Sequence, residues 1–134
     1  IKPIGDAGLF AFQGDHADIA VETSDKMMDE GDAWLVEHEY AERGRLGLHA
    51  GPVAVGRIGA PGEERLDVIG KTVNVGARLV THRMTVTPAV FRKLSAENRK
   101  RFKKHTPPVS YIGVDDPRPS EYWRGQVGEV LPQP

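Results

Sequence analysis

The sequence contains no cysteine, no long apolar run and no excess of either charge. Without cysteine the chain forms neither disulfides nor thiolate metal sites, which fits a reducing compartment. No apolar run approaches the roughly 18 residues that a membrane helix needs, and no charged-then-apolar leader marks secretion. Eighteen Lys and Arg residues balance nineteen Asp and Glu residues, so no net field favours nucleic acid or an anionic membrane. We therefore expect a cytoplasmic segment, alone or within a larger or membrane-attached protein, with no membrane contact and no nucleic-acid partner.

The size and composition of the chain indicate one domain. Hydrophobic residues make up 39% of the 134 positions, which is enough for one core but not for two. Ile1 is not a methionine, and residues 1–4 already resemble a strand, so we expect the natural protein to begin upstream. The prediction is a single, partial domain over residues 1–134, in which residues 113–134 form a C-terminal tail or a closing hairpin.

Apolar periodicity predicts strands and helices that are interleaved along the chain. Strands are expected over residues 1–4, 9–12, 46–50, 53–58, 65–69 and 84–86, and a closing hairpin over 109–112 and 122–127. Helices are expected over residues 15–43, interrupted at Gly31 with Asp32 as a cap, over 72–82, and from Thr87-Pro88 onward. The first helix offers six candidate core residues: Ala17, Ala20, Met27, Met28, Trp34 and Leu35. This interleaving indicates an α+β or α/β fold.

Charge is unevenly distributed along the chain. Residues 15–42 hold ten acids against Lys26 alone, whereas residues 83–104 hold eight Lys and Arg against Glu97. Solvated helix faces explain both segments. The basic run over residues 99–104 lies near a predicted helix C-terminus, where cations are favoured, so it does not require a nucleic-acid partner.

Two aspartates stand at positions where their chemistry matters. Asp6 follows Gly5 at the tip of a predicted hairpin, where a carboxylate can reach a Mg²⁺ ion that keeps several waters. Gly-Asp is also good turn chemistry, so an ordinary turn is the better explanation of this pair taken by itself. Asp67 alternates with Leu66 and Val68 on a predicted strand, where aspartate is disfavoured and needs a reason. That reason is either a strand-end cap or a ligand contact.

A third group lies on the predicted helix over residues 72–82. Apolar residues cover one broad arc of this helix: Val73, Val75, Gly76, Ala77, Leu79 and Val80. Asn74 and Arg78 fall together in the remaining polar arc, four residues apart and therefore adjacent. A guanidinium beside an amide suits a phosphoryl group with developing charge, although spacing alone fits a solvated face as well. The glycine-spaced segment over residues 49–59 indicates a bend or a close backbone approach.

The order and spacing of three motifs resemble those of class III adenylate and guanylate cyclases. The motifs are Lys2-x-Ile4-Gly5-Asp6, then Arg45-Leu46-Gly47-Leu48-His49-Ala50-Gly51-Pro52-Val53, then Leu66-Asp67-Val68-Ile69-Gly70-x-Thr72-Val73-Asn74-x-x-Ala77-Arg78. The resemblance runs from residue 1 to about residue 112, and the segment from Asp115 onward matches nothing in that family's pattern.

The resemblance implies a fold and a site. The family fold is a ferredoxin-like α+β sandwich with a mainly antiparallel sheet, which dimerises head to tail with active sites at the interface. By this resemblance Asp6 binds metal, Lys2 and Asp67 read adenine, and Asn74 and Arg78 orient the ribose and stabilise the pentavalent phosphorus. The implied function is an adenylate cyclase that acts as a homodimer on ATP, with two Mg²⁺ or Mn²⁺ ions per site.

The sequence departs from the family pattern at its start. The family's other metal aspartate lies on a first strand that precedes two helices and the Lys2 motif, and Asp15 and Asp18 are in the wrong place to replace it. We therefore expect the first strand and helices to be missing, so that the fragment alone is inactive while the full-length protein is active. A family lysine that grips the terminal phosphates corresponds loosely to Lys103 or Lys104. The alternatives are a catalytically silent cyclase-like dimerisation or regulatory module and a plain ferredoxin-like ligand-binding domain.

Overall fold

The computed structural model describes residues 2–4, 6–106 and 109–116, with residues 2–4 described as backbone. The predicted strand over residues 122–127 and most of the predicted tail lie outside this part of the chain. The described elements, in chain order, are β1 (Lys2–Ile4), β2 (Ala7–Leu9), α1 (Ala17–Glu37), β3 (Leu46–Leu48), β4 (Ala54–Ile58), β5 (Arg65–Ile69), α2 (Lys71–Arg78), β6 (Met84–Val86), α3 (Pro88–Phe91), α4 (Ala96–Arg99), β7 (Phe102–His105) and β8 (Ser110–Gly113). None of these helices is long and apolar enough to cross a membrane.

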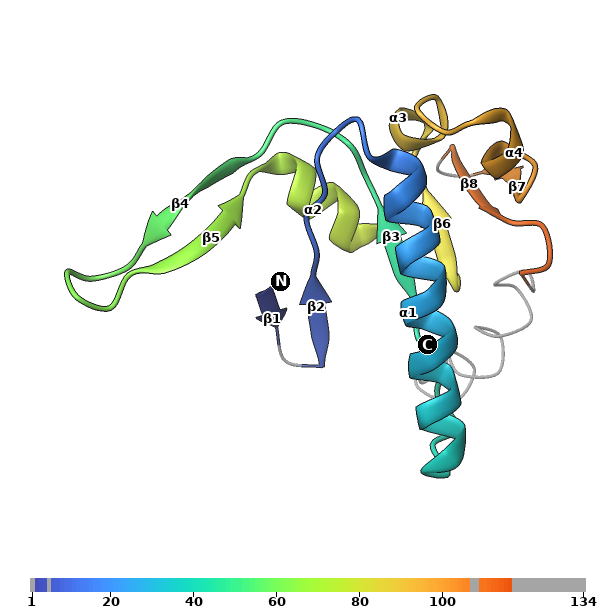
Figure 1. The fold of residues 1–134 in the computed structure, drawn as a ribbon, viewed down its shortest axis with the longest axis horizontal. Coiled ribbons are helices and arrows are strands. Elements are labelled where there is room, and N and C mark those ends of the chain that lie inside the picture. Colours follow the sequence, from blue (N-terminus) through green and yellow to red (C-terminus); the bar gives the residue numbers. More distant parts are fainter. Residues whose placement is uncertain (1, 5, 107–108, 117–134) are drawn as a thin grey trace, which may run out of the picture.

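The strands form one sheet and two separate hairpins (Figure 1). The four-stranded sheet has the order β3-β6-β8-β7, in which β3 runs parallel to β6 and the other neighbours are antiparallel. The β1–β2 and β4–β5 pairs are both antiparallel. Antiparallel pairing therefore prevails, which confirms the predicted mixed α+β class.

The core lies between α1 and one face of the four-stranded sheet. Ala17 and Val21 of α1 pack with Met84 and Val86 of β6 and Phe102 of β7, and Val21 and Val86 are fully buried. Burying an aliphatic side chain of this size contributes about 1.5–3 kcal/mol relative to leaving it exposed. Because these positions alternate on β6 and recur at helical spacing on α1, the sequence pattern itself determines which faces meet.

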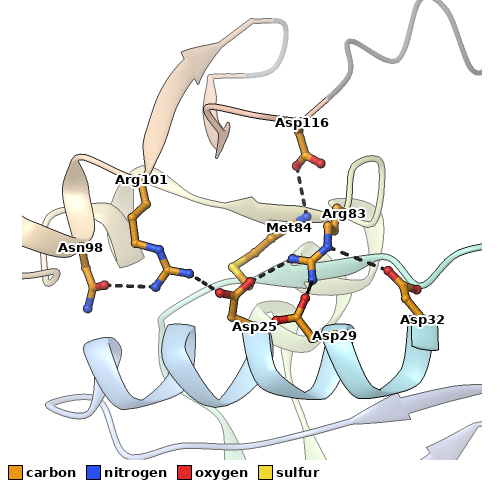
Figure 2. Close-up of polar contacts among 8 residues, drawn as sticks. All are labelled: Asp25, Asp29, Asp32, Arg83, Met84, Asn98, Arg101 and Asp116. Carbon is orange, nitrogen blue, oxygen red and sulfur yellow. Dashed lines mark hydrogen bonds and ion pairs between the residues drawn. The ribbon is translucent and has the colours of Figure 1, made fainter. Parts of the chain in front are cut away.

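Carboxylates of α1 also join the helix to the sheet, through two arginines (Figure 2). Arg83 contacts Asp25 at 2.8 Å and Asp29 at 2.5 Å, and its Nε lies 3.9 Å from Asp32. Arg101 pairs with the other oxygen of Asp25. The prediction that the acidic and basic segments are merely solvated faces is therefore wrong for these residues. Charges that are far apart in the sequence lie next to each other in the fold.

Helix α1 differs from its prediction in three respects. It continues through Gly31 to Glu37, and Asp32 is not a cap but accepts a 2.7 Å hydrogen bond from the backbone N–H of Gly44. Trp34, which was predicted to be a core residue, is 52% exposed. A single glycine costs a helix only about 1 kcal/mol, and here packing and ion pairs along α1 outweigh that cost.

Two strand predictions are also corrected. The second strand is Ala7–Leu9 and not residues 9–12, so the hairpin turn is shorter than predicted. Strand β8 pairs with β7, which occupies residues 102–105, the end of the basic run that was placed near a helix C-terminus. Lys103 and Lys104 of that run are consecutive on β7, which is the last strand in the sheet order, and lysine is common at the exposed edges of sheets.

Candidate functional site

Helix α2 carries Asn74 and Arg78 as an adjacent pair. Both residues are exposed, and neither side chain forms a hydrogen bond or ion pair with another residue in the described ranges. The helix begins directly after β5, and the backbone N–H groups of Val73 and Asn74 both point to the carbonyl of Gly70, at 3.2 and 3.4 Å. It ends at Arg78, earlier than the predicted end at residue 82. The predicted pairing of Asn74 with Arg78 is thus realised on the outer side of a short helix.

The inner side of α2 lies unusually close to the segment that begins with β3. A Cβ atom at Gly47 would lie 2.7 Å from the carbonyl oxygen of Gly76, and one at Gly51 would lie 2.7 Å from Oγ1 of Thr72. Real Cβ atoms do not approach other atoms this closely, so only glycine fits either position. Of the two roles that the sequence left open for residues 49–59, Gly51 has the close backbone approach, and Gly47, just before that segment, has it too; the partner of both is α2.

Asp67 lies on the β4–β5 hairpin, which extends away from the rest of the chain (Figure 1). It stands opposite Gly56 in the antiparallel register. Its side chain is half-buried, and its Oδ1 accepts a 2.7 Å hydrogen bond from the backbone N–H of Val68. Leu66 is 69% exposed, so the apolar face that was inferred for this strand is not a core face within this chain.

The β1–β2 hairpin carries the remaining two candidates. Lys2 pairs with Leu9 in the backbone register of β1 and β2, and its side chain lies outside the described part. Asp6 is exposed in the turn between the strands. In Figure 1 this hairpin, α2 and the β4–β5 hairpin all lie to the left of β3, whereas α1 lies to its right.

The candidate residues therefore occupy three separate segments of the chain. The fold places Lys2 and Asp6 on one hairpin and Asn74 and Arg78 on one helix, while Asp67 stands on a second hairpin. A cavity of about 350 Å³ does lie beside Asp25, Arg83 and Arg101, but none of the five candidates lines it.

The described residues offer little for a metal by themselves. Among them, no group of three or more His, Cys, Asp or Glu side chains is close enough together to hold an ion. Asp6 supplies a single exposed carboxylate at a turn. This fits an ion such as Mg²⁺, which keeps several waters and takes only one or two protein carboxylates.

Several polar residues that sequence reasoning did not single out have structural roles. Asp18 accepts hydrogen bonds from the side chain of Asn98 (2.7 Å) and the backbone of Ser95 (3.0 Å), which hold the pKa of that carboxyl below its usual value. Partial burial alone would lower the pKa of Arg83, but the hydrogen bond and charge of Asp25, with the neighbouring carboxylates, raise it. The sequence did contain a sign of these contacts, because residues 15–42 are acidic and residues 83–104 are basic.

His82 is another buried polar residue that the sequence did not reveal. Its ring lies 4.8 Å from the ring of His105 in an edge-to-face contact, and its Nε2 has no hydrogen-bond partner among the described residues. Burial, followed by the charge of His105, lowers the pKa of His82 from its usual value. His82 follows α2 and precedes β6, so it lies at a junction of the fold and not at the candidate site.

Comparison with known proteins points to one family. Residues 1–110 match the family model described as the adenylate and guanylate cyclase catalytic domain. Comparison with curated proteins gives no match. Among solved structures, the fold is similar to that of a bacterial light-regulated adenylyl cyclase, with a TM-score of 0.61 at 23% sequence identity. The likeness covers 77% of this chain and 35% of that chain, so this chain spans about a third of that protein. It confirms the predicted cyclase fold.

Proposed function

Because the chain belongs to the adenylate and guanylate cyclase catalytic domain family, we propose that it is the catalytic domain of an adenylate cyclase. The reaction converts ATP to cyclic AMP and pyrophosphate, and it takes place at the interface of a homodimer. The observation that supports this most strongly is the Asn74–Arg78 pair, which α2 presents to solvent without partners while its other side is docked.

Arg78 has the right chemistry for the transferring phosphoryl group. When the ribose 3′-oxygen attacks the α-phosphorus, negative charge grows on the phosphoryl oxygens. A guanidinium fork meets that charge with two parallel hydrogen bonds. Because the charge is largest in the transition state, this contact lowers the barrier more than it strengthens substrate binding. Asn74, one helical turn away, offers an amide that can orient the ribose.

Lys2 and Asp67 together favour adenine over guanine. Adenine has an acceptor at N1 and a donor at its exocyclic amine, whereas guanine has the reverse arrangement at these positions. The Lys2 ammonium donates to the first group and the Asp67 carboxylate accepts from the second. We therefore propose ATP as the substrate.

Asp6 would bind a divalent cation, Mg²⁺ or Mn²⁺, with two ions expected per site. Such ions neutralise phosphate charge and lower the pKa of the ribose hydroxyl. The candidates stand on three separate segments of one chain, so we propose that the second copy of the domain completes each site. Two equivalent sites then follow from the two-fold symmetry of the dimer. A cytoplasmic location accords with an ATP substrate.

The proposal is tested by cyclic nucleotide production in the full-length protein and in the 134-residue chain. We expect cyclic AMP from ATP with Mg²⁺ or Mn²⁺ in the full-length protein, little cyclic GMP from GTP, and no product from the 134-residue chain alone. An Asp6→Ala variant should lose metal-dependent turnover. A full-length protein that dimerises but makes no cyclic nucleotide would contradict the proposal and indicate a catalytically silent module.

A further inference from the structure

The two sides of α2 have different environments. Successive residues of an α-helix are rotated by about 100°, so Thr72 and Gly76 share one side, whereas Asn74 and Arg78 share a side turned away by about 200°. The exposure follows this geometry. Thr72 and Gly76 are half-buried, and Asn74 and Arg78 are exposed. How the inner side is held therefore decides where the outer side points.

The first turn of α2 is held by a hydrogen bond. Oγ1 of Thr72 donates to the carbonyl oxygen of Pro52 at 2.6 Å. A Cβ atom at Gly51 would lie 2.7 Å from the same Oγ1 and 3.3 Å from Cγ2 of Thr72. The threonine side chain thus occupies the space that a glycine leaves open, and its hydroxyl is directed at one acceptor.

The last turn of α2 is held by packing. A Cβ atom at Gly47 would lie 2.7 Å from the carbonyl oxygen of Gly76 and 3.0 Å from Cβ of Leu79. Because Gly47 has no side chain, α2 can lie this close to β3, but packing does not fix the rotation of a helix about its axis as a directional bond does. The hydrogen bond of Thr72 is directional, because hydrogen bonds weaken steeply away from their preferred angle.

We propose that Thr72 is a positioning residue for the cyclase reaction. Its hydrogen bond to Pro52 sets the rotation of α2, and thereby the direction in which Asn74 and Arg78 face the nucleotide. This inference rests on the proposed function. Thr72 itself does not touch the reacting atoms, since it lies on the opposite side of the helix. A misplacement of a catalytic group by about 1 Å can cost about 100-fold in rate, so a small rotation is sufficient for a large effect.

The test compares Thr72→Val with Thr72→Ser in the full-length protein. Valine keeps the shape of the side chain but removes the hydroxyl, whereas serine keeps the donor. We expect Thr72→Val to lower kcat at least about tenfold with KM nearly unchanged, because Arg78 meets charge that develops in the transition state. Thr72→Ser should restore kcat to within about threefold of the wild-type value.

A second pair of variants separates positioning from general damage. Gly51→Ala places a methyl group against the Thr72 hydroxyl and should lower kcat as Thr72→Val does. Gly31→Ala, in α1, has no atom within 4 Å of the added Cβ and should leave kcat unchanged. All variants are assayed at a temperature at which circular dichroism shows them to be folded.

Hydrogen exchange of the α2 amides gives a readout that does not require activity. We expect exchange in Thr72→Val to be at least about tenfold faster than in Thr72→Ser, because the helix loses its attachment. If the wild-type protein makes no cyclic nucleotide, the proposed function fails and the positioning role fails with it, and exchange then shows only whether Thr72 holds α2. Equal exchange in the two variants overturns this inference. So does wild-type kcat in Thr72→Val, even with faster exchange, since Thr72 would then be only structural.

Discussion

Arg83 connects three carboxylates of α1 to the start of β6, so its removal should destabilise the protein markedly. In Arg83→Ala the hydrogen bonds to Asp25 and Asp29 are lost, and the three aspartates remain as a row of like charges on one side of the helix. Asp25 keeps its pairing with Arg101, which limits the damage. The substitution thus tests whether the ion pairs between the acidic helix α1 and Arg83 stabilise the fold.

The magnitude follows from how exposed each partner is. The side chains of Arg83 and Asp25 are both 33% exposed, and a hydrogen bond between charged groups of this kind contributes about 1.5–3 kcal/mol. Asp29 is 73% exposed, so its contact adds only about 0–1 kcal/mol. Uncompensated repulsion between helix neighbours adds about 0.2–0.5 kcal/mol per pair. We expect a total loss of about 2–4 kcal/mol in the free energy of unfolding.

The assay is urea unfolding followed by circular dichroism, at low and at high salt. Arg92→Ala is the matched control, because Arg92 is exposed and its side chain has no partner among the described residues. The control should change stability by no more than about 0.5 kcal/mol. The loss in Arg83→Ala should also shrink in high salt, since half-exposed pairs are partly screened. A loss equal to that of Arg92→Ala would refute the reasoning.

Three further predictions concern other parts of the fold. Burial, and after it the charge of His105, lowers the pKa of His82 in the folded state, so the unfolded state binds the proton more readily. The stability that neutral His82 contributes is therefore full above pH 6.5 and is lost as the pH falls below that value. The charged and titratable groups around His82 are His105, Asp116, Lys103 and Arg45. In a His82→Phe variant the free energy of unfolding should depend less steeply on pH between about pH 7 and 5. An unchanged slope would count against this role of His82. Gly31→Ala should stabilise α1 by about 0.5–1 kcal/mol, measured by urea unfolding, because the added methyl meets open space; a loss of stability would contradict it. Lys2→Glu should weaken ATP turnover in the full-length protein, and unchanged kcat/KM for ATP would remove Lys2 from adenine recognition.

Local patterns predicted most of the elements near the candidate site. Strand β5 and strand β6 were predicted at their observed bounds, because short apolar runs between turn residues leave few alternatives. The adjacency of Asn74 and Arg78 follows from helix periodicity alone. The predictions that Lys2, Asp6 and Asp67 act at the same kind of site stay predictions, since Lys2 and Asp6 stand on the β1–β2 hairpin and Asp67 stands on the β4–β5 hairpin.

What the sequence did not predict depends on contacts between distant segments. The extension of α1 through Gly31 is supported by Arg83, which lies more than fifty positions away. Likewise, the sequence alone could not name the element that lies against Gly47 and Gly51, which the fold shows to be α2. A charge pattern shows that two segments are complementary, but only the fold shows that they meet.

The central claim, that two copies of this domain share each ATP-cyclising site, is tested most directly by mixing two inactive variants of the full-length protein. The family resemblance implies that one copy supplies the metal-binding aspartate and the other copy supplies the transition-state residues. Asp6→Ala and Arg78→Ala would then each remove a residue from a different half of one proposed site. In an equal mixture that pairs at random, half of the dimers are mixed and each holds one intact site. Activity should therefore return to about a quarter of the wild-type level. A mixture that makes no more cyclic AMP than the two variants make separately would contradict the account.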